Sequence, residues 1–469
     1  MAEGAPQPDP MSALHWRTAS DLAEAIRTRR LSPVELVEAL LARIDTVGPK
    51  LDAFLHLDAE GALAAAREAE RQIAGGSYLG PLHGLPVGIK DCIDIAGMPT
   101  TCHSKVFLGN IAKADATVTA YLRRAGAILP GKLAMHECAI DGPDFDLPFP
   151  PARNPWNRNH HPGGSSSGSG AAVASGMLPL AVGTDAGGSI RHPASACGIV
   201  GLKPTFGLVP VHGAIPLAYS LDHIGPLARS VADAALLLDG LTGRAGEAGA
   251  SSYGDGLERG AHGLRIGFVR HFHEDDATAD EETAAALDRA ADVLAREGAT
   301  IETAILPRLQ EFMAVVGTIM LSEAWSAYGP LVRERPDDFG GMTRRRFLSG
   351  AFLSASDYVD AQRKRAALID AVEAVFADHD VLLVASSLCP ASRIDDAEEL
   401  ARTYPRQARG PFNVTGHPAL AMMAGLSASG MPLSLQLVGR YRDENTLLRA
   451  AFAFERATEW HTLRPTDTP

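Results

Sequence analysis

Two glycine-serine turns carry the residue types that acyl-transfer chemistry requires. The first turn covers residues 163–168 and the second residues 185–191, with an apolar segment between them. A Gly-Gly step before a serine lets the backbone turn tightly and direct successive N–H groups at one point. Acyl transfer needs a nucleophile beside such donors, which stabilise an oxyanion. The alternative is a flexible Gly/Ser linker, but a linker would not continue into apolar sequence on both sides.

A lysine, Lys90, follows a short apolar strand predicted over residues 85–89. A serine attacks a carbonyl efficiently only when a base accepts its proton. A lysine becomes such a base when its pKa falls from about 10.4 towards neutrality, which burial can produce. A fall of about three units costs roughly 4 kcal/mol. The fold must therefore bury Lys90 and place hydroxyl groups beside its amine.

Other patterns in the sequence suggest different chemistry and fit less well. Residues 164–168 match G-x-S-x-G, which would make Ser166 a hydrolase nucleophile, but that turn requires a strand directly before it and residues 160–162 are His-His-Pro. No lysine follows the glycines, so the phosphate-loop pattern fails. The histidines at 160–161 and 271–273 could bind a metal, but short exposed histidine runs usually do not. We therefore expect no metal site and no cofactor.

Alternating strand and helix patterns must position these residues. Ser32, Pro33 and Glu35 form a capping box that starts a helix. Strands are predicted at 85–89, 127–129, 264–269, 380–385 and 433–438, and helices at 60–74, 115–125, 280–297 and 444–460. Such alternation indicates an α/β layered fold.

Composition narrows the class of protein. The chain has 469 residues, of which 46% are hydrophobic, and a net charge of −13, which argues against a nucleic-acid-binding surface. Its five cysteines include no Cys-x-x-Cys pair and suit a reducing cytosol. The sequence has no signal peptide and no stretch of about 18 apolar residues, so we expect a cytoplasmic protein without a membrane span. Residues 1–12 are predicted to be disordered.

Six short segments occur in a fixed order between residues 80 and 241. They are residues 84–91 (GLPVGIKD), 154–156 (NPW), 162–166 (PGGSS), 183–191 (GTDAGGSIR), 201–205 (GLKPT) and 221–226 (LDHIGP). Together they resemble the amidase signature family, and residues 412–418 and 435–439 are similar to its C-terminal part. The resemblance implies an α/β/α fold with a mixed central sheet covered by helices on both faces. It implies one domain over residues 13–469, with a signature core at about 80–241, a variable, mostly helical region at about 245–378 and a C-terminal return at 380–469.

The resemblance also implies a catalytic triad of a serine, a serine preceded by a cis peptide bond, and a lysine. By motif position these are Ser189 as the nucleophile, Ser165 as the bridging serine and Lys90 as the base. Neutral Lys90 would take a proton from Ser165 while Ser165 takes one from Ser189. The backbone N–H groups expected to hold the oxyanion are those of Ala186, Gly187, Gly188 and Ser189.

Residues that flank the triad receive supporting roles. Asp185 and Arg191 are expected to fix the nucleophile's loop through charge-assisted hydrogen bonds. By motif position, Ala139, Ile140 and Asp141 are expected to line the acyl pocket. If Asp141 faces the substrate, acidic acyl groups are disfavoured.

These features predict an amidase that hydrolyses the C–N bond of a small-molecule amide through an acyl-enzyme. Its expected partner is that substrate. We expect it to bind neither nucleic acid nor a membrane, and the sequence leaves open whether it forms a homodimer. The alternative is the glutaminase subunit of a tRNA-dependent amidotransferase, which acts only with partner subunits. Relatives of that kind tend to have a Gly-Ser-Ser stretch where this chain has residues 140–148 (IDGPDFDLP), and this difference favours a freestanding amidase.

Overall fold

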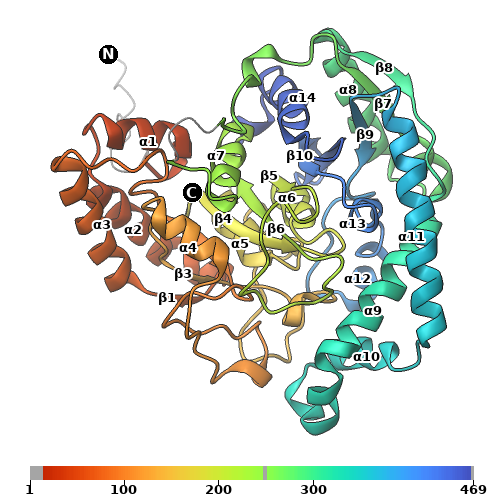
Figure 1. Cartoon of the computed structure of the whole chain (residues 1–469), viewed down its shortest axis with the longest axis horizontal. Coiled ribbons are helices and arrows are strands. Elements are labelled where there is room, and N and C mark those ends of the chain that lie inside the picture. Colours follow the sequence, from red (N-terminus) through yellow and green to blue (C-terminus); the bar gives the residue numbers. More distant parts are fainter. Residues whose placement is uncertain (1–13, 247–250, 466–469) are drawn as a thin grey trace, which may run out of the picture.

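The computed structural model describes residues 14–246 and 251–465, and within them a single sheet of 11 strands forms the centre of the molecule (Figure 1). The segment 1–12, which is predicted to be disordered, lies outside the described residues. The strands are β1 (Phe54–Leu57), β2 (Val87–Lys90), β3 (Gly131–Leu133), β4 (Leu180–Asp185), β5 (Val200–Lys203), β6 (His223–Ala228), β7 (Arg265–Phe268), β8 (Thr300–Thr303), β9 (Val381–Ala385), β10 (Ala419–Leu426) and β11 (Pro432–Gly439).

The sheet is mixed, as predicted. Its strand order is β1-β3-β2-β4-β6-β5-β10-β11-β9-β7-β8. β2 is parallel to both β3 and β4, and β7 is parallel to β8 and β9. The other pairings are antiparallel. Because β2 and β4 are parallel neighbours, their C-terminal ends, which carry Lys90 and Asp185, lie at the same edge of the sheet.

Helices surround this sheet, with α1–α3 on one side of Figure 1 and α9–α11 on the other. The Ser32–Glu35 capping box is present at the start of α2, as the sequence predicts. The helices are α1 (Ala19–Arg27), α2 (Pro33–Leu51), α3 (Ala59–Ala74), α4 (Thr117–Arg124), α5 (Ser167–Ala174), α6 (Arg191–Cys197), α7 (Val231–Leu241), α8 (Glu281–Arg296), α9 (Leu309–Glu334), α10 (Gly341–Gly350), α11 (Ala355–Phe376), α12 (Ala397–Thr403), α13 (Pro411–Val414) and α14 (Glu444–Arg456).

Strand β4 shows that both faces of the sheet are buried. Leu180 and Val182 belong to the large hydrophobic cluster that also contains the leucines of α7. Ala181, between them, belongs to a second cluster with Ala171, Ala172 and Val173 of α5. Successive residues of a strand point to opposite faces, so helices cover the sheet on both sides.

The strand predicted at residues 127–129 is displaced in the structure. Ile128 makes only an isolated bridge with Pro86, and the strand β3 begins at Gly131. Lys132, in the middle of β3, is buried and lies 3.1 Å from the Asp91 carboxylate, with further hydrogen bonds to Pro99 and Thr100. A charged residue at this position breaks the apolar pattern that marks a buried strand, which explains the displacement.

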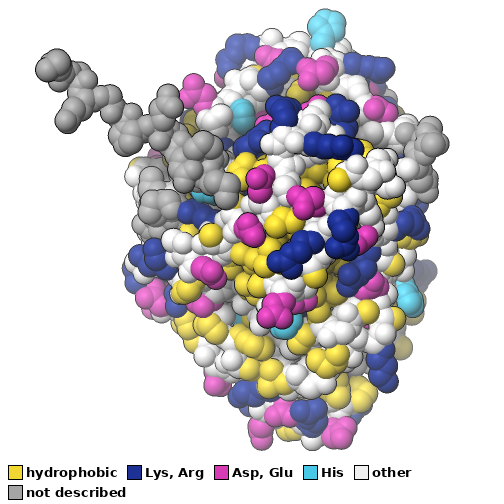
Figure 2. Space-filling view, turned by 90° about the vertical axis from the view of Figure 1, so that its left-hand side faces the viewer, with side chains coloured by type: hydrophobic (Ala, Val, Ile, Leu, Met, Phe, Trp, Pro, Cys, Tyr) yellow, Lys and Arg dark blue, Asp and Glu magenta, His cyan; other side chains and the backbone are white. Residues whose placement is uncertain are grey.

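The surface of the molecule is mixed in charge. On the face seen in Figure 2, acidic and basic side chains are interspersed with hydrophobic ones, and the described atoms form no extended region of one charge. In the described part of the chain, no helix is both long and apolar enough to cross a membrane.

Candidate active site

Lys90 lies at the end of β2 and is fully buried. Its Nζ atom is 2.7 Å from the Ser165 Oγ atom and 2.7 Å from the Thr184 Oγ1 atom. Burial lowers the pKa of Lys90, because the surrounding protein solvates the ammonium form poorly. Two hydroxyl groups thus contact an amine that favours its neutral form, which is the environment that a lysine base requires.

Ser165 follows Gly164 through a cis peptide bond, in the loop before α5. Its carbonyl accepts a hydrogen bond of 3.0 Å from the backbone N–H group of His136. The His136 ring packs so closely on Gly164 that a Cβ atom there would collide with it. The backbone and the ring therefore fix the position of Ser165 against Lys90.

Ser189 lies on the second glycine-serine turn and is partly exposed. Its carbonyl accepts a hydrogen bond of 3.2 Å from the N–H group of Ser166, which joins the two turns directly beside Ser165. Within the residues that the structure describes, no hydrogen bond links the hydroxyl groups of Ser165 and Ser189. The expected proton relay needs one contact between Lys90 and Ser165 and another between Ser165 and Ser189. Only the contact between Lys90 and Ser165 is present among the described residues.

The predicted oxyanion donors divide into two groups. The Gly188 N–H group donates to the Asp185 Oδ1 atom over 2.7 Å and is occupied. The N–H groups of Ala186, Gly187 and Ser189 donate to no acceptor within residues 14–246 and 251–465. These three groups are thus the ones that could receive a developing negative charge.

Asp185 and Arg191 form a fully buried ion pair, with Arg191 Nη2 2.9 Å from Asp185 Oδ1. Asp185 also accepts from the N–H group of Ile190 (3.1 Å) and from the side chain of Asn413 (2.8 Å). Burial alone would raise the pKa of Asp185, but Arg191 beside it holds the pKa well below its usual value. The carboxylate therefore stays charged and ties the Ser189 loop to the C-terminal part of the chain.

The three residues predicted to line the acyl pocket take different places. Ala139 lines a cavity of about 280 Å³ together with Thr184 and Asp222. Ile140 is buried. Asp141 lies 3.3 Å from the Nε atom of Arg346, and burial raises its pKa to about 6. Since Arg346 faces Asp141, this carboxylate does not stand alone against an acidic substrate.

Sequence reasoning missed several polar residues that complete the site. Thr184 is the second hydroxyl partner of Lys90. Asn413 and Gln436 bind Arg191 from the C-terminal part of the chain. Both lie in the segments 412–418 and 435–439, which are similar to the family's C-terminal part. Their position in these motifs could therefore have indicated a role in the site. For Thr184 the only signal was its place directly before Asp185.

The alternative nucleophile and the histidine runs do not form other sites. The Ser166 hydroxyl bonds the backbone of Thr184, donating to its carbonyl over 3.2 Å and accepting from its N–H group over 3.3 Å. Such a hydroxyl joins α5 to β4 and is not free to react. Among the residues described, no group of three His, Cys, Asp or Glu side chains could hold a metal ion.

Comparison with known proteins gives matches over almost the whole chain. A family profile described as Amidase matches residues 35–448. A glutamyl-tRNA(Gln) amidotransferase subunit of Roseiflexus sp. (strain RS-1) is 39% identical over 486 aligned positions, which cover 97% of this chain and 99% of the relative. The same subunit of Chloroflexus aggregans (strain MD-66 / DSM 9485) is 38% identical, with the same coverage.

Solved structures of similar proteins share the fold. A chain described with a vestigial protein complex that reveals the evolutionary origins of an s-triazine catabolic enzyme has a TM-score of 0.86 and 34% identity, covering 94% of this chain and 98% of that one. The peptide amidase of Stenotrophomonas maltophilia has a TM-score of 0.84 and 28% identity, covering 96% and 98%.

These relatives correct one expectation. The expectation of a small-molecule amide as the partner, with no nucleic acid involved, is wrong, because the relatives of 38–39% identity are subunits of an amidotransferase named for a tRNA. The error has a physical reason. A net charge of −13 describes this chain alone and carries no information on a partner that could bind an RNA.

The ion pair between Asp185 and Arg191 yields a stability prediction. Arg191→Met leaves the buried Asp185 carboxylate without its cation, so we expect the free energy of unfolding to fall by about 3–5 kcal/mol. Urea denaturation measures this change. Arg270→Met is the control, since the ion pairs that it breaks, with Glu274 and Asp288, are exposed and their loss is expected to cost less than about 1 kcal/mol. Equal effects of the two variants would contradict a special role for the buried pair.

The burial of Lys90 yields a pH prediction. A lysine with a lowered pKa is protonated at low pH and neutral above that pKa, so kcat/KM for amide hydrolysis is expected to rise with pH and then level off. Lys90→Arg keeps the charge at every pH and is expected to lose at least about 100-fold in kcat/KM. The exposed substitution Lys105→Arg is the control. A flat pH profile, or a Lys90→Arg variant of near-normal activity, would disprove the assignment of Lys90 as base.

Proposed function

The chain belongs to the amidase signature family, and we propose that it is the amide-hydrolysing subunit of a tRNA-dependent amidotransferase. In this role it releases ammonia from glutamine, and partner subunits use that ammonia on a glutamyl-tRNA. Hydrolysis of a C–N bond is the chemistry of the family. The choice of glutamine and the need for partners are the proposed part.

The proposed reaction begins with proton transfer away from Ser189. Neutral Lys90 takes a proton from the Ser165 hydroxyl as Ser165 takes one from Ser189, whose Oγ atom attacks the amide carbon. The free N–H groups of Ala186, Gly187 and Ser189 hold the oxyanion, and each donor is worth roughly 3 kcal/mol in the transition state. The C–N bond then breaks, and Ser165 returns a proton to the departing nitrogen, which leaves as ammonia.

Water completes the proposed cycle. It attacks the acyl ester on Ser189, giving one proton to the same Ser165–Lys90 pair, and the ester bond breaks to release the carboxylic acid. The proton then returns to Ser189. The contact that supports this sequence is the 2.7 Å approach of Lys90 Nζ to Ser165 Oγ, because it couples a buried amine to the bridging hydroxyl.

The observation that carries the choice of partner-dependent function is similarity over the full length. Relatives that are subunits of the amidotransferase match 97% of this chain and 99% of their own length. A match that extends over both ends includes the variable helices as well as the signature core. The segment at 140–148 that favours a freestanding amidase is short by comparison, and Arg346 balances the charge of its Asp141.

The experiment that tests this proposal is purification of the tagged chain from its native host, followed by glutaminase assays. We expect partner subunits to co-purify, and we expect ammonia release from L-glutamine to be at least tenfold faster in the complex than with the chain alone. A Ser189→Ala complex is the blank. A chain that purifies without partners and hydrolyses simple amides at full rate would contradict the proposal and favour a freestanding amidase.

A further inference from the structure

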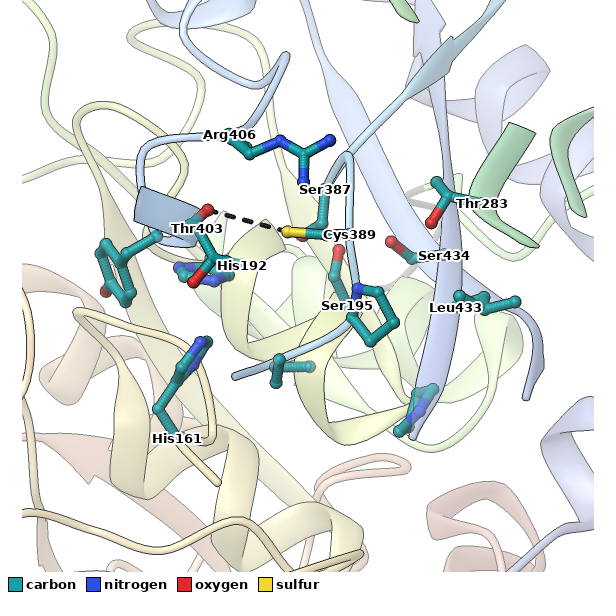
Figure 3. A pocket seen from close by; sticks show the side chains of 15 residues that line it. His161, His192, Ser195, Thr283, Ser387, Cys389, Thr403, Arg406, Leu433 and Ser434 are labelled. Atoms are coloured by element: carbon teal, nitrogen blue, oxygen red, sulfur yellow. Dashed lines mark hydrogen bonds between the residues drawn. The ribbon is translucent and has the colours of Figure 1, made fainter. Parts of the chain in front are cut away.

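Three histidine side chains meet at the loop that carries Ser165, which comprises residues 162–165. His136 follows β3, His161 directly precedes the loop, and His192 lies on α6. All three residues are buried. Figure 3 shows His161 and His192 close together at one edge of a polar hollow, and their ring centroids are 5.4 Å apart. Buried polar rings usually have hydrogen-bonding partners, so the partners of these rings indicate what the cluster does.

Each histidine contacts a different part of this loop. The His161 Nδ1 atom accepts a hydrogen bond of 3.0 Å from the Gly163 N–H group. The His192 ring is hydrogen-bonded to the backbone of Gly164. The His136 ring lies so close that a Cβ atom at Gly164 would be 2.0 Å from its Cε1 atom. The three rings therefore hold both glycines that precede the bridging serine.

A tyrosine directly after α12 contacts all three rings. The ring centroid of Tyr404 is 5.2 Å from that of His161, 4.7 Å from that of His192 and 6.0 Å from that of His136. The contacts with His161 and His192 are edge-to-face, a geometry that aromatic rings favour. The Tyr404 hydroxyl oxygen is also 3.2 Å from the His136 Nδ1 atom. One side chain thus packs the three histidines together.

The histidines act through packing and hydrogen bonds and carry no charge. Burial lowers the pKa of His136 and His161 to about 3 and that of His192 well below its usual value, so all three rings are neutral at pH 7. The His136 Nδ1 atom is 2.8 Å from the carbonyl oxygen of Asp141, which can only accept, so this nitrogen carries the ring's proton. Neutral rings can pack closely where charged rings would repel one another.

The position of the loop matters because the Ser165 hydroxyl contacts Lys90. The two atoms are 2.7 Å apart, and Lys90 is fixed at the end of β2. Hydrogen bonds weaken beyond about 3.2 Å, so a small movement of the loop would break this contact. A displacement of about 1 Å in a catalytic group can reduce a rate by roughly 100-fold. Any residue that holds the two glycines therefore also controls the position of Ser165.

We propose that Tyr404 is a positioning residue: by packing the three histidines against the loop, it keeps Ser165 in contact with Lys90. This inference rests on the roles of Ser165 and Lys90 in the amide hydrolysis proposed above. Tyr404 acts through the histidine rings and not on the substrate. It lies outside the segments that resemble the family, so the site extends to a part of the chain that those segments do not mark.

Labelling of Ser189 in the full chain by phenylmethanesulfonyl fluoride, measured across pH, tests this inference without a known substrate or a partner subunit. In the parent protein, labelling is expected to accelerate as the pH rises, because Lys90 loses its proton. Tyr404→Leu removes the ring. We expect it to slow labelling by about 10- to 100-fold at high pH, and by less than about threefold at low pH, where Lys90 is protonated and the relay does not operate. Tyr404→Phe keeps the ring contacts and should recover most of the lost rate.

Tyr121→Leu is the matched control, because it removes another partly buried tyrosine ring, which packs against Arg124 on α4. It should leave the labelling rate unchanged at every pH. A loss of folded protein would lower the rate of Tyr404→Leu by the same factor at every pH, and that result would overturn the inference. So would an unchanged rate, or a Tyr404→Phe variant as slow as Tyr404→Leu. If Tyr404→Leu does not fold, His161→Phe, which lacks the acceptor for the loop, must show the loss at high pH.

The outcomes separate this inference from the proposed function. A parent protein whose labelling does not rise with pH would refute Lys90 as the base, and the role of Tyr404 would fall with it. A parent protein that shows the rise, together with a Tyr404→Leu variant that labels normally, would refute this inference alone. Absence of partner subunits would refute the amidotransferase proposal and leave the positioning role of Tyr404 standing.

Discussion

The buried ion pair between Asp185 and Arg191 is the constraint on which the rest of the site depends. Two charges removed from water are tolerated only when every lone pair and donor around them is satisfied. Here the satisfying groups are the backbone of the Ser189 loop and side chains from the last quarter of the chain. One interaction therefore sets the shape of the loop and also holds α13, through Asn413, and β11, through Gln436, against it.

This constraint determines which donors remain for catalysis. Because Asp185 takes the N–H group of Gly188, that group cannot also face an oxyanion. The N–H groups of Ala186, Gly187 and Ser189 stay available as a result. On the other side, the parallel pairing of β2 and β4 brings Lys90 to Thr184 and Ser165, where burial weakens its affinity for a proton. The pairing of the strands thus positions Lys90 and Ser165, and the ion pair of Asp185 shapes the loop that carries Ser189.

Much of this arrangement could be predicted from the sequence, because its main parts are local. The capping box at Ser32, the strand that delivers Lys90 and the two glycine-serine turns each lie within a few residues. Asp185 and Arg191 are also six positions apart in one motif. The pairing of two groups so close in sequence depends mainly on the turn between them.

The parts that could not be predicted depend on distant contacts. Arg409 reaches Arg191 from 218 positions along the chain, and no local pattern marks it. The predicted position of β3 was a few residues too early, because its central Lys132 does not fit an apolar pattern. This lysine is stabilised by Asp91, which follows another strand. The expectation that no nucleic acid is involved was wrong, since the net charge of a single chain does not report on what its partners bind.

Covalent labelling tests the central claim, that Ser189 is the nucleophile and Lys90 its base, most directly. The purified protein is treated with phenylmethanesulfonyl fluoride, which reacts with activated serine hydroxyls, and the modified peptide is identified by mass spectrometry. The account predicts a single adduct on Ser189, formed more slowly in a Lys90→Met variant by a factor of about 100, the typical contribution of a general base. An adduct on Ser165 or Ser166, or an unchanged rate in the Lys90 variant, would contradict it.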